Sequence, residues 1–276
     1  MLTDDERRQG AQLLFDAERQ REAIPQLSKT FPGIEIVDAY RIQDLWAELK
    51  MALGVGVAGH KIGLTSRAMQ MASKMTEPDY GRIYDDAIYN DGAQIPAGRF
   101  LKPRLEVELA FVMGEDLEGP GKRIYDVMRA AEYVIPALEI IDYRTEVPRA
   151  ITDTIADNAA FGAIVVGGRP IRPMDVDIRW VGATLSKNGT IEESGVSAAI
   201  MGHPSGRGRR LARQQTPRRR REATERSDRA RRFVHPPGRH RPGRCDSCGL
   251  RSARRNRRFI CLRFESNSPS TRSNAH

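Results

Sequence analysis

Two glutamates lie one residue apart in a stretch that alternates strictly between polar and apolar residues, RLEVEL at positions 104–109. Alternation with a period of two predicts a half-buried strand. The three apolar residues then face the core, and Arg104, Glu106 and Glu108 share the other face. Two carboxylates one pleat apart could hold a cation, although charged side chains more often lie in water. Arg104 would pair with these glutamates or, less favourably, with a substrate carboxylate.

A third carboxylate, Glu139, lies within the very apolar segment YVIPALEII at 133–141. An isolated buried carboxylate is costly, so it either takes up a proton or finds a cation. Three carboxylates without histidine or cysteine suit a hard, oxygen-preferring ion that keeps open water positions. We therefore predict that Glu106, Glu108 and Glu139 bind Mg²⁺ or Mn²⁺.

Two further residues could move protons. Lys61 lies in the segment GHKIGLTS at 59–66, a predicted short strand or turn, among small and apolar neighbours. Lysine is usually a surface charge, but burial near a metal would lower its pKa and let it exchange protons near neutral pH. Asp79 lies in EPDYG at 77–81, where it either forms the turn or acts as a general base on a loop.

The elements that position these residues begin with two predicted helices. Thr3 and Glu6 have the spacing of a capping box, and the first helix should end near Pro25. A second helix starts at Asp38, places apolar residues on one stripe and ends at Gly54. The next residues, GVGVAG at 54–59, match G-x-G-x-x-G, but a helix precedes them where a dinucleotide-binding loop requires a strand. We reject that interpretation.

The remaining elements are predicted strands. Ala163–Val166 reads as a buried strand, and Asn188-Gly189 predicts a hairpin between 181–185 and 190–192. The fold class is therefore α+β, with a β-rich body and helices at the N-terminal end.

Charge divides the 276 residues into two unlike parts. From Ser205 onward there are 22 arginines, no lysine and five acidic residues, whereas the preceding part has a net charge of −8. All three cysteines lie in the basic part. No apolar run is long enough for a membrane span, and no signal peptide is visible. An acidic body without cysteine predicts a cytoplasmic protein of bacterial type.

Five segments taken together closely resemble a known family. They are 59–66, 77–81, PRLEVE at 103–108, IPALE at 135–139 and Asp157-Asn158-Ala159. In this order and with little gapping, they resemble the 2-oxohept-3-ene-1,7-dioate hydratases, which belong to the hydratase/decarboxylase branch of the fumarylacetoacetate hydrolase superfamily. The resemblance runs from about Ala11 to Pro204.

The resemblance implies a mixed, β-rich roll like the C-terminal domain of that superfamily. It also implies a metal-dependent lyase that adds water to 2-oxohept-3-ene-1,7-dioate, giving 4-hydroxy-2-oxoheptane-1,7-dioate in the breakdown of homoprotocatechuate. Glu106, Glu108 and Glu139 match the metal ligands, and Lys61 and Asp79 match the proton-transfer residues. A 2-oxopent-4-enoate hydratase and a 4-oxalocrotonate decarboxylase are the alternatives. The intact form is expected to be a homo-oligomer.

The resemblance stops at Pro204, which sets the predicted boundary between an incomplete hydratase domain, 1–204, and a tail, 205–276. The tail could be read as a nucleic-acid-binding arm, and its CDSC at 245–248 as a zinc site of unusual spacing. We favour neither, because arginine in excess without lysine is typical of a GC-rich gene read out of frame.

The out-of-frame interpretation can be checked by back-translation. Restarting one base later lets residues 209–216 read VAWLANKL, and residues 251–261 permit PLGGIAVSFV. These strings resemble the C-terminal strands of the same hydratases, so we infer a net one-base insertion near the Pro204 codon. We expect the native C-terminal strands to be missing, the tail to be disordered and to bind no specific nucleic acid, and the activity to be impaired.

Overall fold

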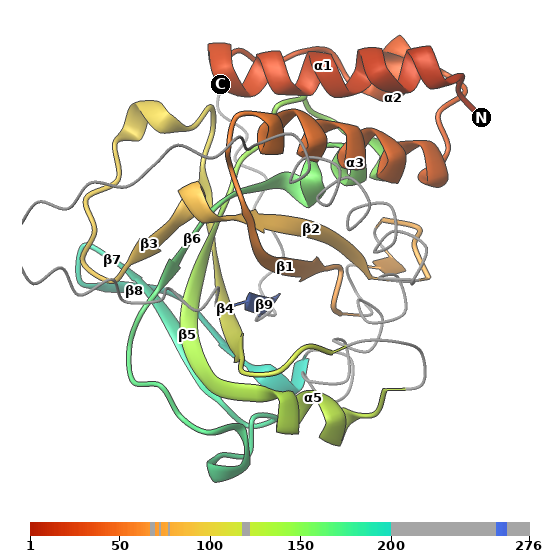
Figure 1. The fold of residues 1–276 in the computed structure, drawn as a ribbon. Helices are drawn as coiled ribbons and strands as arrows, with labels where there is room; N and C mark the ends of the chain where they lie inside the picture. The colour runs from red at the N-terminus through yellow and green to blue at the C-terminus, as the bar shows by residue number, and fades with distance from the viewer. Residues whose placement is uncertain (67–69, 72, 77, 118–121, 200–257, 264–276) are drawn as a thin grey trace, which may run out of the picture.

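The computed structural model of the chain describes residues 1–66, 70–71, 73–76, 78–117, 122–199 and 258–263. Three helices form the N-terminal part, α1 (Asp4–Gln20), α2 (Leu27–Thr30) and α3 (Ile36–Ala52). They lie together beside one end of a β-sheet (Figure 1). The two long helices pack against each other through buried apolar residues, among them Leu14, Phe15, Ile42 and Trp46.

Local sequence explains where these helices begin. The predicted capping box is confirmed: the Glu6 backbone N–H donates to Thr3 Oγ1 over 3.3 Å, and Thr3 N–H donates to the Glu6 carboxylate over 2.7 Å. Helix α3 begins two residues before the predicted start at Asp38, because the Asp38 side chain accepts the Glu35 N–H at 2.9 Å and so caps the helix from inside its first turn.

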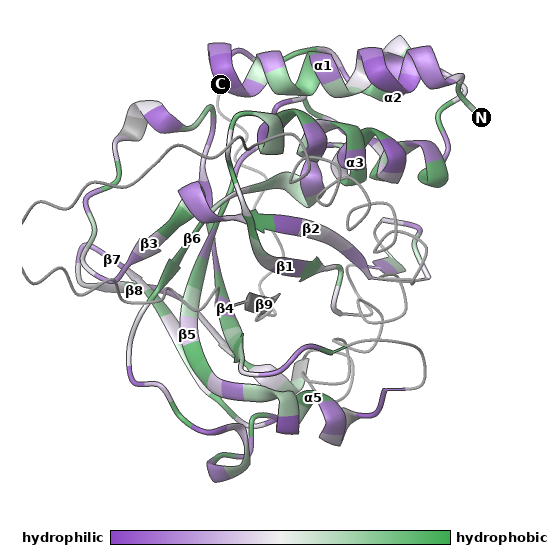
Figure 2. Ribbon diagram, viewed as in Figure 1, coloured by the Kyte–Doolittle hydropathy of each residue, from purple (hydrophilic) through white to green (hydrophobic). Residues whose placement is uncertain are grey.

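The sheet has seven strands in the order β2-β1-β9-β4-β5-β6-β3, and a separate hairpin is formed by β7 and β8. The strands are β1 (Val57–Gly63), β2 (Asp79–Tyr84), β3 (Ile88–Asn90), β4 (Arg104–Met113), β5 (Ala131–Ile141), β6 (Phe161–Val166), β7 (Gly182–Lys187), β8 (Thr190–Val196) and β9 (Arg258–Arg263). Short helices connect them: η1 (Asp85–Ala87), η2 (Ala97–Arg99), α5 (Ile124–Ala130), α6 (Ile151–Ala156), η3 (Asn158–Ala160), η4 (Pro173–Asp175) and η5 (Ser197–Ala199). The α+β class with a mixed sheet is as predicted. In Figure 2, hydrophobic residues colour much of β4, β5 and β6, whereas α1 is largely hydrophilic.

Strand β9 comes from the arginine-rich part of the chain. It pairs in parallel with β1 and antiparallel with β4, so it lies between them. The expectation that residues from Ser205 onward are largely disordered leaves room for one short strand. Phe259–Leu262 is a run of four apolar residues. The edges of β1 and β4 have unpaired backbone groups that such a run can pair with. The rest of the tail, including the CDSC segment at 245–248 that was considered and rejected as a zinc site, lies outside the described residues.

Strand β4 is buried differently from the prediction. Leu105 was expected in the core but is 50% exposed, and Glu108, expected on a polar face, is 1% exposed. The two halves of the strand differ in surroundings. Residues Glu108–Met113 have β9 on one side and β5 on the other, whereas Arg104–Val107 pair with β5 alone. Successive residues from Glu108 to Val112 are all buried, so this half of β4 is covered on both faces.

The predicted hairpin is confirmed. Asn188 and Gly189 connect β7 to β8 with positive φ angles of 51° and 81°, which is the conformation that the Asn-Gly pair favours in a two-residue turn. Among the described residues, no helix combines the length and apolar character needed to cross a membrane.

Candidate metal centre and proton-transfer residues

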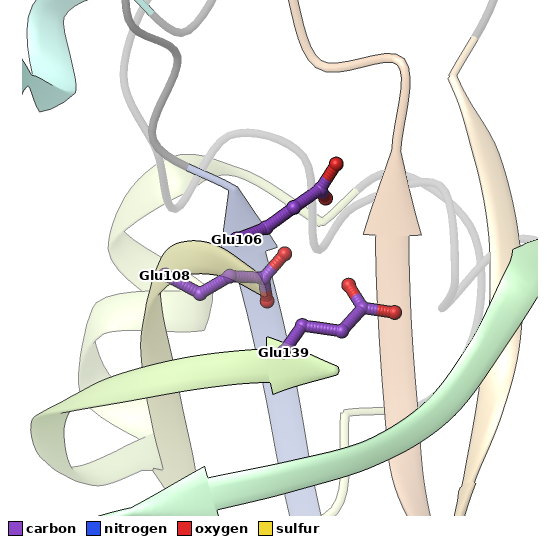
Figure 3. Close-up of side chains that lie close together, drawn as sticks. All are labelled: Glu106, Glu108 and Glu139. Atoms are coloured by element: carbon purple, nitrogen blue, oxygen red, sulfur yellow. The ribbon is translucent and has the colours of Figure 1, made fainter. Parts of the chain in front are cut away.

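The three predicted metal ligands come together. One carboxylate oxygen from each of Glu106, Glu108 and Glu139 lies within 4.8 Å of the others. Figure 3 shows the carboxylates of two β4 residues and one β5 residue gathered on the same side of the sheet. Glu106 lies directly opposite Glu139 in the antiparallel pair. Like charges at directly opposed positions are destabilising, so this register favours an additional positive charge between them.

The electrostatics of the glutamates points the same way. Glu108 and Glu139 are each 1% exposed, and none of their four carboxylate oxygens accepts a hydrogen bond from the described residues. Burial, and then the neighbouring charge of Glu139, raise the pKa of Glu108 well above its ordinary value. Unsatisfied buried carboxylate oxygens are rare and costly. The donor set and its orphaned oxygens fit a divalent cation.

Lys61 on β1 places a positive charge beside the glutamate cluster. It is buried, with Nζ 3.2 Å from Glu139 Oε1 in an ion pair that lacks hydrogen-bond geometry, and 3.0 Å from the carbonyl oxygen of Ala159, to which it donates. Burial alone would lower the pKa of Lys61, but the carboxylates around it, Glu139 first, raise it further than burial lowers it. The predicted fall in this pKa concerns a lysine beside a bound metal ion, and it stays a prediction for that state.

Asp79 lies beside Lys61. It is the first residue of β2 rather than part of a loop, it pairs with Gly63 of β1, and it is 3% exposed. Burial raises its pKa, and the charge of Lys61 opposes that rise in part. A Cβ atom at position 63 would overlap Asp79 Oδ1 and lie 3.5 Å from Lys61 Nζ. Gly63 thus leaves the space in which these two side chains approach each other.

One contributor to the site was not predicted. Asn158, Ala159 and Ala160 form η3 with φ angles of 52°, 51° and 61°, a left-handed turn that costs energy for residues other than glycine. This turn directs the Ala159 carbonyl toward Lys61. It is fastened to β2, because the Arg82 N–H donates to Asn158 Oδ1 over 2.7 Å. Asparagine tolerates positive φ, but the two alanines do not favour it, so local pattern does not predict a turn of three such residues.

The predicted pairing of Arg104 with the glutamates is not observed. Arg104 is exposed at the start of β4, and within the part of the chain that the structure describes it forms no ion pair. Its neighbour across the ladder is Ile141.

Comparison with known proteins supports one family. No model of a protein family matches the chain. The chain is 50% identical over 202 residues to the 2-oxo-hept-4-ene-1,7-dioate hydratase of Escherichia coli, which covers 71% of this chain and 76% of the relative. It is 38% identical over 204 residues to a 2-keto-4-pentenoate hydratase of Paraburkholderia xenovorans, covering 74% and 76%.

A solved structure agrees with these relatives. The 4-oxalocrotonate decarboxylase of Pseudomonas putida, complexed with magnesium and adipate, superposes with a TM-score of 0.76 at 28% identity, over 98% of this chain and 92% of the decarboxylase. Sequence and fold therefore agree with the resemblance carried by the five segments. The chain belongs to the hydratase/decarboxylase branch of the fumarylacetoacetate hydrolase superfamily.

Proposed function

We propose that this chain is a divalent-metal-dependent hydro-lyase. It adds water to a seven-carbon unsaturated 2-oxo dicarboxylate and gives 4-hydroxy-2-oxoheptane-1,7-dioate. The observation that carries the proposal is the cluster of three carboxylates, of which Glu108 and Glu139 are buried without hydrogen bonds, beside a buried lysine and a buried aspartate. The 50% identity to a hydratase of this substrate class supports it.

The position of the double bond matters chemically. The family resemblance implied the 3-ene, whereas the name of the E. coli relative places the double bond at carbon 4. A double bond between C3 and C4 is conjugated with the 2-oxo group, so water can add at C4. A bond between C4 and C5 is not conjugated, and a proton must first leave C3 while another reaches C5. Both substrates therefore require a proton-exchanging group beside C3 to C5.

Glu106, Glu108 and Glu139 would hold the cation, and hard carboxylate oxygens favour Mg²⁺ or Mn²⁺. A divalent cation there supplies Lewis-acid chemistry that draws electron density away from the 2-oxo group. The magnesium in the solved decarboxylase supports this assignment.

Asp79 and Lys61 would divide the proton chemistry. The raised pKa of Asp79 makes its carboxylate a stronger base than usual, so it takes a proton from the attacking water as the water oxygen bonds to C4, and returns a proton to C3. The Lys61 ammonium, held beside Glu139 and the Ala159 carbonyl, would stabilise negative charge that develops on the substrate oxygen. The hydrogen bond to Ala159 holds its ammonium in place.

The test is product analysis in ¹⁸O-labelled water with the full chain and added Mg²⁺. Hydration predicts one labelled oxygen at C4 of the product and no CO₂. Release of CO₂ would identify a decarboxylase instead, and an unchanged substrate at every metal concentration would contradict the proposed activity.

We also propose bounds for the hydratase domain and an oligomeric state for the protein. Residues 1–204 would form the hydratase domain, with β9 adding a strand to its sheet. A homo-oligomer of the intact form is testable by sedimentation, where a monomer at micromolar concentration would contradict it.

A further inference from the structure

Arg149 has the features of an anion-binding residue that lacks its anion. It lies in the segment between β5 and α6, its side chain is 11% exposed, and its guanidinium carbon sits 3.4 Å from the centroid of the Tyr143 ring. Nη1 is buried and makes no hydrogen bond to the described residues. The nearest carboxylate oxygen, Asp157 Oδ2, is 3.9 Å away, too far for a hydrogen bond.

Asp157 is in fact committed to another arginine. It accepts hydrogen bonds from the side chain and the backbone N–H of Arg144, and its own carbonyl accepts a third from Arg144 Nη2 at 2.9 Å. The two arginines differ accordingly: the pKa of Arg144 is raised by its carboxylate partner in spite of burial, whereas burial lowers the pKa of Arg149. A buried charge without a full partner is costly, unless a ligand supplies the partner.

The position of Arg149 relative to the site is informative. Arg149 lies 3.9 Å from Asp157, which comes two residues before Ala159 in the chain. The Ala159 carbonyl accepts a hydrogen bond from Lys61. The charge of Arg149 also acts on Asp79. Lys61 in turn lies between this turn and Glu139. Contacts therefore run from the carboxylate cluster to Lys61, and from the turn that binds Lys61 back to Asp157 and Arg149.

This order matches the order of groups in the proposed substrate. Its 2-oxo acid end would lie at the carboxylate cluster, the reacting carbons C3 to C5 at Lys61 and Asp79, and the C7 carboxylate beyond them. We propose that Arg149 binds the distal C7 carboxylate and so selects dicarboxylates over monocarboxylates. The inference rests on the proposed function for the identity of the substrate. A planar guanidinium pairs with both oxygens of a carboxylate, and the Tyr143 ring fixes its plane.

The experiment compares two ligands that differ only in the distal carboxylate, 2-oxoheptanedioate and 2-oxoheptanoate. Affinities would be measured by calorimetry on the full chain with Mg²⁺ at pH 7. The unaltered chain should prefer the dioate by about 10- to 100-fold, the range of a charged hydrogen-bonded pair. Arg149→Met should lose this preference and bind the monoacid within about threefold of the unaltered chain. Arg129→Met, at an arginine whose side chain is 78% exposed, is the matched control and should keep the preference.

Each result decides something. An unaltered chain without preference for the dioate overturns the inference, and so does an Arg149→Met chain that keeps the preference or weakens both ligands equally, as a purely structural residue would. Should Arg149→Met fail to fold, Arg149→Lys is the second variant, because it keeps the charge but not the two parallel hydrogen bonds. Its preference for the dioate should be weaker than that of the unaltered chain, and an unchanged preference would overturn the inference. A preference that depends on Arg149 without hydration of the unsaturated dioate would refute the proposed function while leaving this inference intact.

Discussion

Replacing Glu108 by Gln should stabilise the metal-free chain and abolish its response to Mg²⁺. The carboxylate is 1% exposed, neither oxygen accepts a hydrogen bond from the described residues, and the charge of Glu139 is close by. A buried unsatisfied group costs about 1–3 kcal/mol, and more when it is charged. We expect Glu108→Gln to raise the free energy of unfolding by about 2 kcal/mol at pH 7 in EDTA. For a domain of this size that corresponds to a rise in Tm of roughly 4–8 °C.

The sign of the pH dependence follows from the raised pKa of Glu108. Between the ordinary pKa of 4.5 and the raised value, the folded state holds a proton that the unfolded state has lost, so metal-free stability falls as the pH rises through this window. Gln does not titrate. The advantage of Glu108→Gln should therefore be small below the ordinary pKa and grow as the pH rises.

Magnesium should reverse the ranking. At a concentration 100 times its Kd, Mg²⁺ stabilises a binding-competent chain by about 2.7 kcal/mol, and it should leave Glu108→Gln nearly unchanged. Thermal unfolding in EDTA and in Mg²⁺ at several pH values measures both effects. Glu132→Gln, at an exposed glutamate of the same β5 strand that carries Glu139, is the control. A Glu108→Gln chain that is less stable in EDTA, or equally stabilised by Mg²⁺, would refute the reasoning.

Three other predictions concern separate parts of the chain. Asp38→Asn should lower the free energy of unfolding by about 1–3 kcal/mol at pH 7, because Asp38 accepts backbone and arginine hydrogen bonds. The pKa of Asp38 is lowered, so this contribution is present above the unfolded pKa and disappears as the pH falls through the folded one; urea titrations that show an equal loss in strong acid would contradict this. Gly63→Ala should displace Asp79 and reduce kcat on the order of 100-fold while the affinity for Mg²⁺ stays the same, and an unchanged kcat would remove Asp79 from the mechanism. Resequencing the codons for Ile200–Arg210 should reveal one extra base, and a confirmed reading frame would reject the insertion.

Much of the site followed from short-range pattern. Alternation placed Glu106 and Glu108 on one face, and the apolar surroundings of Glu139 predicted its burial. What pattern could not supply were effects of distant chain segments. Glu108 is buried although it belongs to the polar set of the alternating pattern, and the raised pKa of Lys61 depends on Glu139, a residue 78 positions later. The same holds for Arg149, since its environment of Tyr143, Asp157 and Asp79 exists only after folding.

Fold class was more predictable than the burial of single residues. The capping box of Thr3 and the Asn188-Gly189 turn have local causes, and both are in the structure. Leu105 was expected to be buried and is 50% exposed. Alternation assigns each residue to a face of the sheet, but it does not tell whether another part of the chain covers that face. The left-handed turn at Ala159 is likewise held by the hydrogen bond between Asn158 and β2, because its two alanines do not favour positive φ.

The place of β9 in the sheet has a consequence for how the chain folds during synthesis. Phe259 pairs with Gly59 of β1 and with Val112 of β4, so the last strand joins two parts that were made much earlier. The 144 residues between Met113 and Arg258 take about 7–30 s to translate at ordinary rates. Throughout that interval β1 and β4 each have an unpaired strand edge, and unpaired edges promote aggregation. Released chains that end before and after β9 should therefore differ sharply in protease resistance; equal resistance would mean that the sheet closes without its final strand.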